Sequence, residues 1–187
     1  QAPRYAQEGT SCEEKVIEME LKLIADIGII GMPNAGKSTL LAHITAAKPK
    51  IANYPFTTLH PNLGVLELTD KYITIADIPG LIEGAHQGVG LGDEFLRHIE
   101  RTKLLLHVVD LSDEDPLHKY EVINNELKNY NPELSKKEQI LILNKIDIPE
   151  AVINEEMFSK NETILISAAT GEGLDNLKKV LEQKTRS

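Results

Sequence analysis

Residues 31–38 read Gly-Met-Pro-Asn-Ala-Gly-Lys-Ser, and this stretch decides the fold that the chain is expected to adopt. The apolar run 27–30 precedes it and residues 39–42, Thr-Leu-Leu-Ala, follow it, so the context predicts a strand, a tight loop and a helix. A loop with the pattern G-x-x-x-x-G-K-[ST] is typical of phosphate binding, because its backbone N–H groups and the helix N-terminus surround negative charge. The sequence therefore predicts a site for the phosphate chain of a nucleotide.

The glycines and polar residues of this loop have separate expected roles. Gly31 and Gly36 should hold the loop shape, because only glycine allows so tight a curl without a clash at Cβ. Lys37 should reach the β and γ phosphates, and the Ser38 hydroxyl should bind Mg²⁺.

A second motif, Asn-Lys-Ile-Asp at residues 144–147, follows an apolar run and indicates which base is bound. The Asp147 carboxylate can accept hydrogen bonds from guanine N1–H and the exocyclic amine, whereas adenine would leave it unpaired. Asn144 should tie this loop to the phosphate loop, and the apolar stem of Lys145 should cover one face of the base. Residues 167–169, Ser-Ala-Ala, follow another apolar strand and could direct a backbone N–H at guanine O6.

Two segments between these motifs should respond to the γ phosphate. Asp77 and Gly80 bound the sequence Asp-Ile-Pro-Gly at the end of a strand. There the carboxylate can hold the Mg²⁺ shell through water, and the glycine N–H can meet the γ phosphate. Residues 53–59 form an irregular segment, in which either Thr57 or Thr58 could complete the Mg²⁺ coordination when GTP is bound. The motifs thus predict a switch with GTP-bound and GDP-bound arrangements.

The order of these motifs resembles that of the translation-factor-related GTPases, and the details resemble the Obg family. The details are residues 31–39, residues 54–64 (Tyr-Pro-Phe-Thr-Thr-Leu-His-Pro-Asn-Leu-Gly) and residues 77–92 (Asp-Ile-Pro-Gly-Leu-Ile-Glu-Gly-Ala-His-Gln-Gly-Val-Gly-Leu-Gly). The resemblance implies a P-loop NTPase of the Ras-like type, with GTP as substrate, GDP as product and Mg²⁺ as cofactor. It also implies a switch that acts with the large ribosomal subunit during assembly and in the stress response, and it selects Thr58 over Thr57.

Motif and resemblance together define the expected site. The residues expected to bind the nucleotide are Gly31, Pro33, Asn34, Ala35, Gly36, Lys37, Ser38, Thr39, Phe56, Thr57, Thr58, Asp77, Gly80, Asn144, Lys145, Asp147, Ser167, Ala168 and Ala169. The expected metal ligands are Ser38, Thr58 and Asp77, and the expected catalytic residues are Lys37, Thr58, Gly80 and Asn34.

The resemblance also implies how the chain is divided. Residues 1–25 correspond to the end of a glycine-rich N-terminal domain and a linker, and residues 26–187 correspond to the GTPase domain.

Length, charge and cysteine content limit the remaining choices. A chain of 187 residues is long enough to form one domain with a full hydrophobic core, without disulfide bonds or structural metals to stabilise it. The single cysteine, Cys12, excludes an internal disulfide, and no apolar stretch approaches about 18 residues, so a cytoplasmic protein without membrane partners is the expectation. We also expect a monomer. With 29 acidic against 20 basic residues the net charge is −9, which argues against nonspecific binding of nucleic acid by this domain. A basic patch at Lys178, Lys179, Lys184 and Arg186 is either a local RNA contact or a solvated helix face.

Apolar runs alternate with amphipathic stretches along the chain, which predicts an α/β fold with a doubly wound, mostly parallel sheet. Only Thr69 and Asp70 separate two of the strands, so one strand must be antiparallel. The expected strands are 26–31, 62–68, 71–76, 104–110, 140–144 and 163–167, and the expected helices are 37–46, 93–101, 116–130, 150–158 and 173–184.

For GTP hydrolysis, the sequence lacks one residue that small GTPases commonly use. Small GTPases commonly place a glutamine after the Asp-x-x-Gly motif to orient the attacking water, and this chain has Leu81 there. Because leucine cannot position water, slow intrinsic hydrolysis is expected. Asn34 has two open interpretations. It holds a K⁺ ion beside the transferring phosphate, as the resemblance suggests, or its amide stabilises the loop.

Three functions compete at this point. The first is the Obg-type GTPase switch, and the second is a slowly hydrolysing sensor of GDP or ppGpp, which Leu81 favours. The third is a P-loop ATPase or kinase, which is disfavoured because adenine offers Asp147 no matching donors.

Overall fold

The computed structural model describes residue 12, residues 25–45, 50–51, 62–77, 102–149, 151, 158 and 162–185. Its elements are β1 Ile27–Ile30, α1 Lys37–Ile44, β2 Lys50–Ile51, β3 Asn62–Glu67, β4 Tyr72–Asp77, β5 Leu104–Asp110, α3 Pro116–Tyr130, the short 3₁₀ helix η2 Leu134–Lys136, β6 Gln139–Asn144, β7 Glu162–Leu165 and α4 Leu174–Lys184. The expected helices 93–101 and 150–158 lie outside the described residues, apart from residues 151 and 158.

The strands form one seven-stranded sheet in the order β2-β3-β4-β1-β5-β6-β7. From β4 to β7 all neighbours are parallel, whereas β3 pairs antiparallel with both β2 and β4. The Leu68 N–H donates to the Lys71 carbonyl (2.9 Å), so Thr69 and Asp70 alone turn the chain between β3 and β4. The predicted mostly parallel sheet with one antiparallel strand is confirmed.

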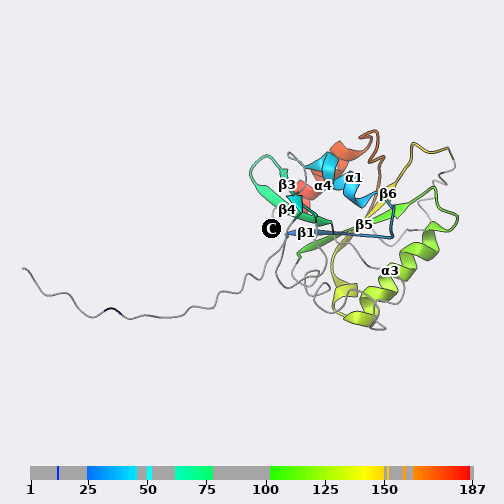
Figure 1. Ribbon diagram of the computed structural model, residues 1–187, viewed down its shortest axis with the longest axis horizontal. Coiled ribbons are helices and arrows are strands. Elements are labelled where there is room, and N and C mark those ends of the chain that lie inside the picture. Colours follow the sequence, from blue (N-terminus) through cyan, green and yellow to red (C-terminus); the bar gives the residue numbers. More distant parts are fainter. Residues whose placement is uncertain are drawn as a thin grey trace, which may run out of the picture.

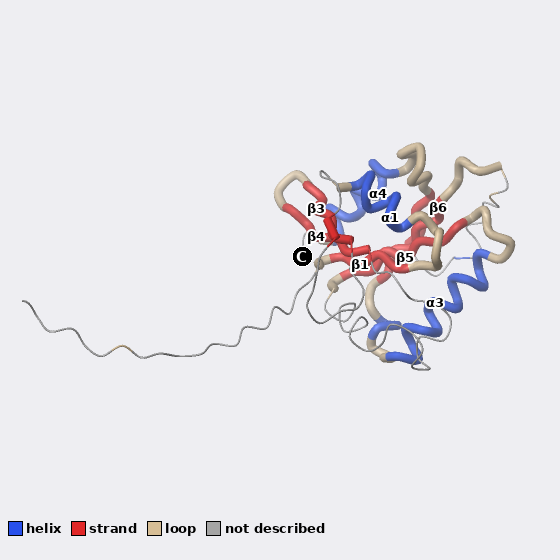
Figure 2. The backbone as a smooth tube through the Cα atoms, viewed as in Figure 1, coloured by secondary structure: helices blue, strands red, loops and turns tan. Residues whose placement is uncertain are grey.

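Helices cover both faces of this sheet (Figures 1 and 2). On one face α1 and α4 pack through Leu40, Leu41, Leu177 and Leu181 onto alternate strand residues. On the other face α3 packs through Ile123 and Leu127 onto the intervening strand residues. Because both faces are covered, β5 is buried at every residue from 104 to 109, as expected for a central parallel strand.

The boundaries of several elements differ from those expected. α1 ends at Ile44 rather than at residue 46, because Thr45 is extended and its hydroxyl donates to the Leu41 carbonyl (2.7 Å). β7 ends at Leu165 rather than at residue 167, since the chain then curls into a loop closed by the Gly171 N–H on the Ser167 carbonyl (2.9 Å). The short elements β2 and η2 were not expected, because runs of two or three residues carry no usable periodicity.

Among the described helices, α3 is the one whose two ends the local sequence explains best. Its start and end match the expected 116–130, because Pro116 stands at the first helical turn and the Asp115 carboxylate accepts the His118 N–H (2.9 Å). In the part of the chain that the structure describes, no helix is both long enough and apolar enough to cross a membrane.

Candidate nucleotide-binding site

The loop between β1 and α1 has the curled backbone that the glycines were expected to allow. Gly31 and Gly36 have φ of 146° and 94°. A Cβ at Gly31 would lie 2.3 Å from the Val108 carbonyl oxygen, and one at Gly36 would lie 2.2 Å from the Asn144 side-chain nitrogen. Both positions therefore exclude any side chain, because of backbone conformation and because of close neighbours.

The remaining residues of the loop form its exposed rim. Pro33 and Asn34 are exposed, and Asn34 has φ of 63°, a left-handed conformation that asparagine tolerates. Ala35 is buried, with its N–H on the Met32 carbonyl (3.3 Å), and Thr39 is exposed on the first turn of α1.

Lys37 folds back over this loop. Its Nζ donates to the carbonyls of Gly31 (3.0 Å) and Met32 (2.9 Å). Burial lowers the pKa of this ammonium, and the negative charge of Asp77 opposes that shift. The Lys37 ammonium is thus a partly desolvated cation beside the phosphate loop, where it can neutralise the negative charge of a phosphate chain.

Ser38 and Asp77 meet beside Lys37. The Ser38 hydroxyl donates to Asp77 Oδ2 at 2.5 Å, although these residues come from α1 and the end of β4. The other carboxylate oxygen, Oδ1, is buried without a hydrogen-bond partner among the described residues. Mg²⁺ is a hard cation that prefers oxygen ligands. An unpaired carboxylate oxygen next to a hydroxyl therefore fits Mg²⁺ and its bound water.

Asn144, at the end of β6, joins three loops. Its Nδ2 donates to the Ala35 carbonyl of the phosphate loop (2.8 Å), and its Oδ1 accepts the N–H of Ala168 (2.9 Å). The side chain is buried, and so these bonds act in a medium of low dielectric constant. The expected tie between the Asn144 loop and the phosphate loop is confirmed, and the tie to the loop after β7 was not foreseen.

The loop after β7 is more restricted than the sequence indicated. The Ser167 N–H donates to the Glu172 carbonyl (3.0 Å), and the Ser167 hydroxyl accepts the Thr170 N–H (3.1 Å). With the Ala168 N–H on Asn144, two of the three candidate donors to guanine are already engaged. The Ala169 N–H makes no hydrogen bond to another described residue, and Ala169 is exposed.

Asp147 and Lys145 lie on the turn that follows β6. Asp147 is exposed, and the turn is held by the Ile146 N–H on the Ile166 carbonyl (3.3 Å) and the Ile148 N–H on the Lys145 carbonyl (3.1 Å). Lys145 makes an ion pair with Asp110, at the end of β5. The expected residues Phe56, Thr57, Thr58 and Gly80 lie outside the described residues, as does Leu81.

The site includes residues that sequence reasoning missed. Asp110 Oδ1 accepts the N–H (2.9 Å) and the hydroxyl (2.6 Å) of Ser112. An acidic residue at the tip of an apolar strand, followed by x-Ser, is the available signal, because Asp commonly accepts the N–H two residues on. The strand 104–110 was predicted correctly without any role for its last residue.

Taken together, the described motif residues gather at one edge of the sheet. Gly31 follows β1, Asp77 ends β4, Asn144 ends β6 and Ser167 lies just beyond β7, so all are at carboxyl ends of parallel strands. This is where open α/β sheets bind ligands.

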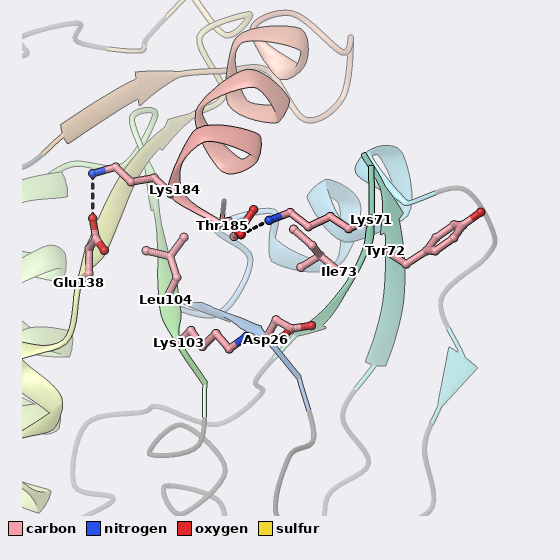
Figure 3. A pocket seen from close by; sticks show the side chains of 9 residues that line it. All are labelled: Asp26, Lys71, Tyr72, Ile73, Lys103, Leu104, Glu138, Lys184 and Thr185. Carbon is pink, nitrogen blue, oxygen red and sulfur yellow. Dashed lines mark hydrogen bonds and ion pairs between the residues drawn. The ribbon is translucent and has the colours of Figure 1, made fainter. Parts of the chain in front are cut away.

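A cavity of about 330 Å³ lies at the opposite edge, where the parallel strands begin (Figure 3). Its lysines are paired: Lys71 donates to the Thr185 carbonyl, Lys103 lies 3.4 Å from Asp26, and Lys184 lies 2.7 Å from Glu138 and 3.0 Å from Glu162. Bonds to Glu138 and Glu162 raise the pKa of Lys184 to about 12. All three lysines that line the cavity therefore have partners. Lys184 is ion-paired, so it is not part of an unpaired basic patch.

Comparison with known proteins agrees with this geometry. The model of the family described as 50S ribosome-binding GTPase matches residues 26–145. The chain therefore belongs to this family of GTPases.

The chain is also similar to proteins named GTPase Obg. It is 58% identical over 193 residues to GTPase Obg of Persephonella marina and 56% identical over 194 residues to GTPase Obg of Aquifex aeolicus. Each match covers 98% of this chain but 57% of the relative, so the chain spans little more than half the length of these proteins. The resemblance to the Obg family is confirmed.

A solved structure shares the fold. Era, in complex with MgGDPNP and nucleotides 1506-1542 of 16S ribosomal RNA, superposes with a TM-score of 0.63 at 27% identity, covering 87% of this chain and 56% of that chain. The P-loop GTPase fold is thereby confirmed.

Proposed function

We propose that this chain binds guanine nucleotides and hydrolyses GTP as a molecular switch of the Obg type. The observation that carries the proposal is the buried Asn144 side chain, which joins the phosphate loop to the loops expected to read the base. One nucleotide can touch all of these loops only if they are held together in this way. Membership of a GTPase family and the similarity to GTPase Obg support the same conclusion.

The proposed site uses the chain's own residues in defined roles. The backbone from Gly31 to Thr39 surrounds the phosphates, and Lys37 exchanges its carbonyl partners for phosphate oxygens. Asp147 selects guanine, and the Ala169 N–H, which is not engaged elsewhere among the described residues, is the donor to guanine O6. Phe56, Thr57, Thr58 and Gly80 complete the proposal on the strength of the sequence motifs alone.

Mg²⁺ would be held by the Ser38 hydroxyl and, through water, by Asp77, with Thr58 as a further ligand. When bound, the ion neutralises charge on the phosphates. The 2.5 Å contact between Ser38 and Asp77 and the buried, unpaired Asp77 Oδ1 support this assignment.

Binding of nucleotide to this chain tests the base assignment. GDP should bind in the presence of Mg²⁺, with ATP competing poorly, and Asp147→Asn should reduce the preference for guanine by at least tenfold, because an amide cannot accept both guanine donors. Calorimetry with GDP and competition by ATP measure both quantities. Absence of heat with GDP, from folded protein, would contradict the proposal.

Turnover is proposed to be slow in this chain, with K⁺ contributing charge near the transferring phosphate through Asn34. Asn34 is exposed on the loop before α1, and its backbone is left-handed, with φ of 63°. GTP hydrolysis should be faster in K⁺ than in Na⁺, and Asn34→Ala should abolish the difference. Equal wild-type rates in the two salts would leave Asn34 as a loop-stabilising residue only.

For the longer protein, we propose a role on the large ribosomal subunit during its assembly and in the stress response, in the cytoplasm. The family description and the similarity to GTPase Obg support this role, and the family match beginning at residue 26 supports a domain boundary after residue 25. The alternative is a sensor of GDP or ppGpp, favoured by Leu81. Single-turnover hydrolysis with and without ribosomal subunits separates the two, because only the switch should be accelerated.

A further inference from the structure

The tips of β5 and β6 are joined by an ion pair that the motifs did not indicate. Lys145 Nζ donates to Asp110 Oδ2, and the two side chains are 28% and 13% exposed. The tips are also joined by the Leu111 N–H on the Asn144 carbonyl (3.1 Å). A pair that is so far withdrawn from water is screened less than the exposed pairs of the surface.

The Asp110 carboxylate is fixed before it meets Lys145. Its second oxygen accepts both the N–H and the hydroxyl of Ser112. Burial alone would raise the pKa of Asp110, but the bonds from Lys145 and Ser112 outweigh burial and lower it. Asp110 is therefore an ionised anchor held at a set position by its own loop.

Lys145 itself has an unusual backbone conformation. Its φ is 70°, in the left-handed region that long side chains rarely adopt. It stands between Asn144, which is held by two buried hydrogen bonds, and the exposed Asp147. Because the four-carbon stem of lysine is flexible, the direction of this side chain depends on what holds its ammonium.

We propose that Asp110 is a positioning residue for the base: it fixes the ammonium of Lys145 so that the apolar stem of this lysine lies along one face of guanine. The inference rests on the proposed guanine-nucleotide site. It adds the loop after β5 to that site and assigns to Asp110 an effect on affinity, while Asp147 retains the choice between guanine and adenine.

A double-mutant cycle on GDP affinity tests this. Fluorescent GDP is titrated into the wild type, Asp110→Asn, Lys145→Met and the double variant. Asp110→Asn should weaken binding about tenfold when Lys145 is present and less than twofold in the Lys145→Met background. Equal losses in both backgrounds, or no loss in either, would overturn the proposal, since a purely structural role of Asp110 does not depend on Lys145.

Two further variants separate charge and folding from positioning. Asp113 is close in sequence and pairs with Lys119, so Asp113→Asn removes the same charge and should bind GDP like the wild type. Asp110→Glu retains a carboxylate and should recover most of the affinity; binding as weak as that of Asp110→Asn would also overturn the proposal. Should Asp110→Asn fail to fold, the cycle is run with Asp110→Ser, which also lacks the carboxylate. Failure of the wild type to bind GDP would instead contradict the proposed function.

Discussion

At the scale of single residues, the most unusual group is His107, which lies in the middle of β5. It is buried, and its Nδ1 has no hydrogen-bond partner among the described residues. The centroid of its ring lies 4.8 Å from that of Tyr120 in α3, with the two rings tilted by 34°. Burial lowers the pKa of His107 to about 4; the neighbouring Gln139 side chain opposes the shift, and the charge of Lys37 adds to it. The imidazole is therefore neutral in the folded protein at physiological pH.

This depressed pKa should make stability depend on pH. Between pH 6.5 and about 4 the unfolded chain binds a proton at His107 that the folded chain does not, so stability is lost as pH falls through this window. Replacing His107 by leucine removes this contribution. Between pH 7 and pH 5 the wild type should lose about 2 kcal/mol more of its free energy of unfolding than His107→Leu does.

Urea denaturation of both proteins at the two pH values measures the difference. His43→Gln, at an exposed position on α1, is the control and should behave like the wild type. An equal loss in wild type and His107→Leu would show that His107 is protonated as readily in the folded chain as in the unfolded one.

At the scale of elements, two glycines shape the loop that contains Ala169 and leads into α4. Gly173 caps the N-terminus of α4 with φ of 78°, and a Cβ there would lie 2.2 Å from the Leu165 carbonyl oxygen. Gly171, with φ of 88°, has no atom within 4 Å of such a Cβ. The two glycines share a left-handed backbone but differ in the space around them.

The pair of alanine variants separates these effects. Gly171→Ala should cost about 1 kcal/mol, because strain of the left-handed backbone is the only penalty. Gly173→Ala should cost about 3 kcal/mol, because the backbone must also move away from Leu165. Free energies of unfolding from denaturant titration decide the matter, and similar costs for the two variants would mean that the loop relaxes freely around Gly173.

At the scale of the whole molecule, the site is built from loops whose only common feature is their position at the carboxyl ends of parallel strands. A nucleotide that contacts several of these loops binds the folded chain and not the unfolded one. Binding must therefore raise the stability of the entire domain.

GDP with Mg²⁺ at a hundred times its dissociation constant should add about 2.7 kcal/mol and raise the Tm by about 5–10 °C. Lys37→Ala should remove most of this shift, because it takes away the cation held over the phosphate loop. Lys179→Ala, which removes the same charge from an exposed position on α4, should keep it. Thermal unfolding with and without GDP measures the shifts; an undiminished shift in Lys37→Ala would exclude that lysine from the phosphate site.

The sequence by itself determined the chain order of strands β1 and β3–β7 and of helices α1, α3 and α4, together with the antiparallel hairpin and the placement of motifs at strand ends. These follow from local rules: glycine and proline positions, apolar periodicity and a turn too short for a crossover. Even α3 could be bounded to the residue, because its cap and first proline are neighbours in the chain.

Only the tertiary structure decided which groups near the site have partners. The Ser167 and Ala168 N–H groups are engaged by Glu172 and Asn144, which leaves Ala169, and Lys145 is anchored by Asp110, 35 residues earlier in the chain. Such pairings depend on the register between β5 and β6 and on the curl of a loop. No simple spacing along the chain encodes them, because they depend on the alignment of distant strands or on the three-dimensional course of a loop.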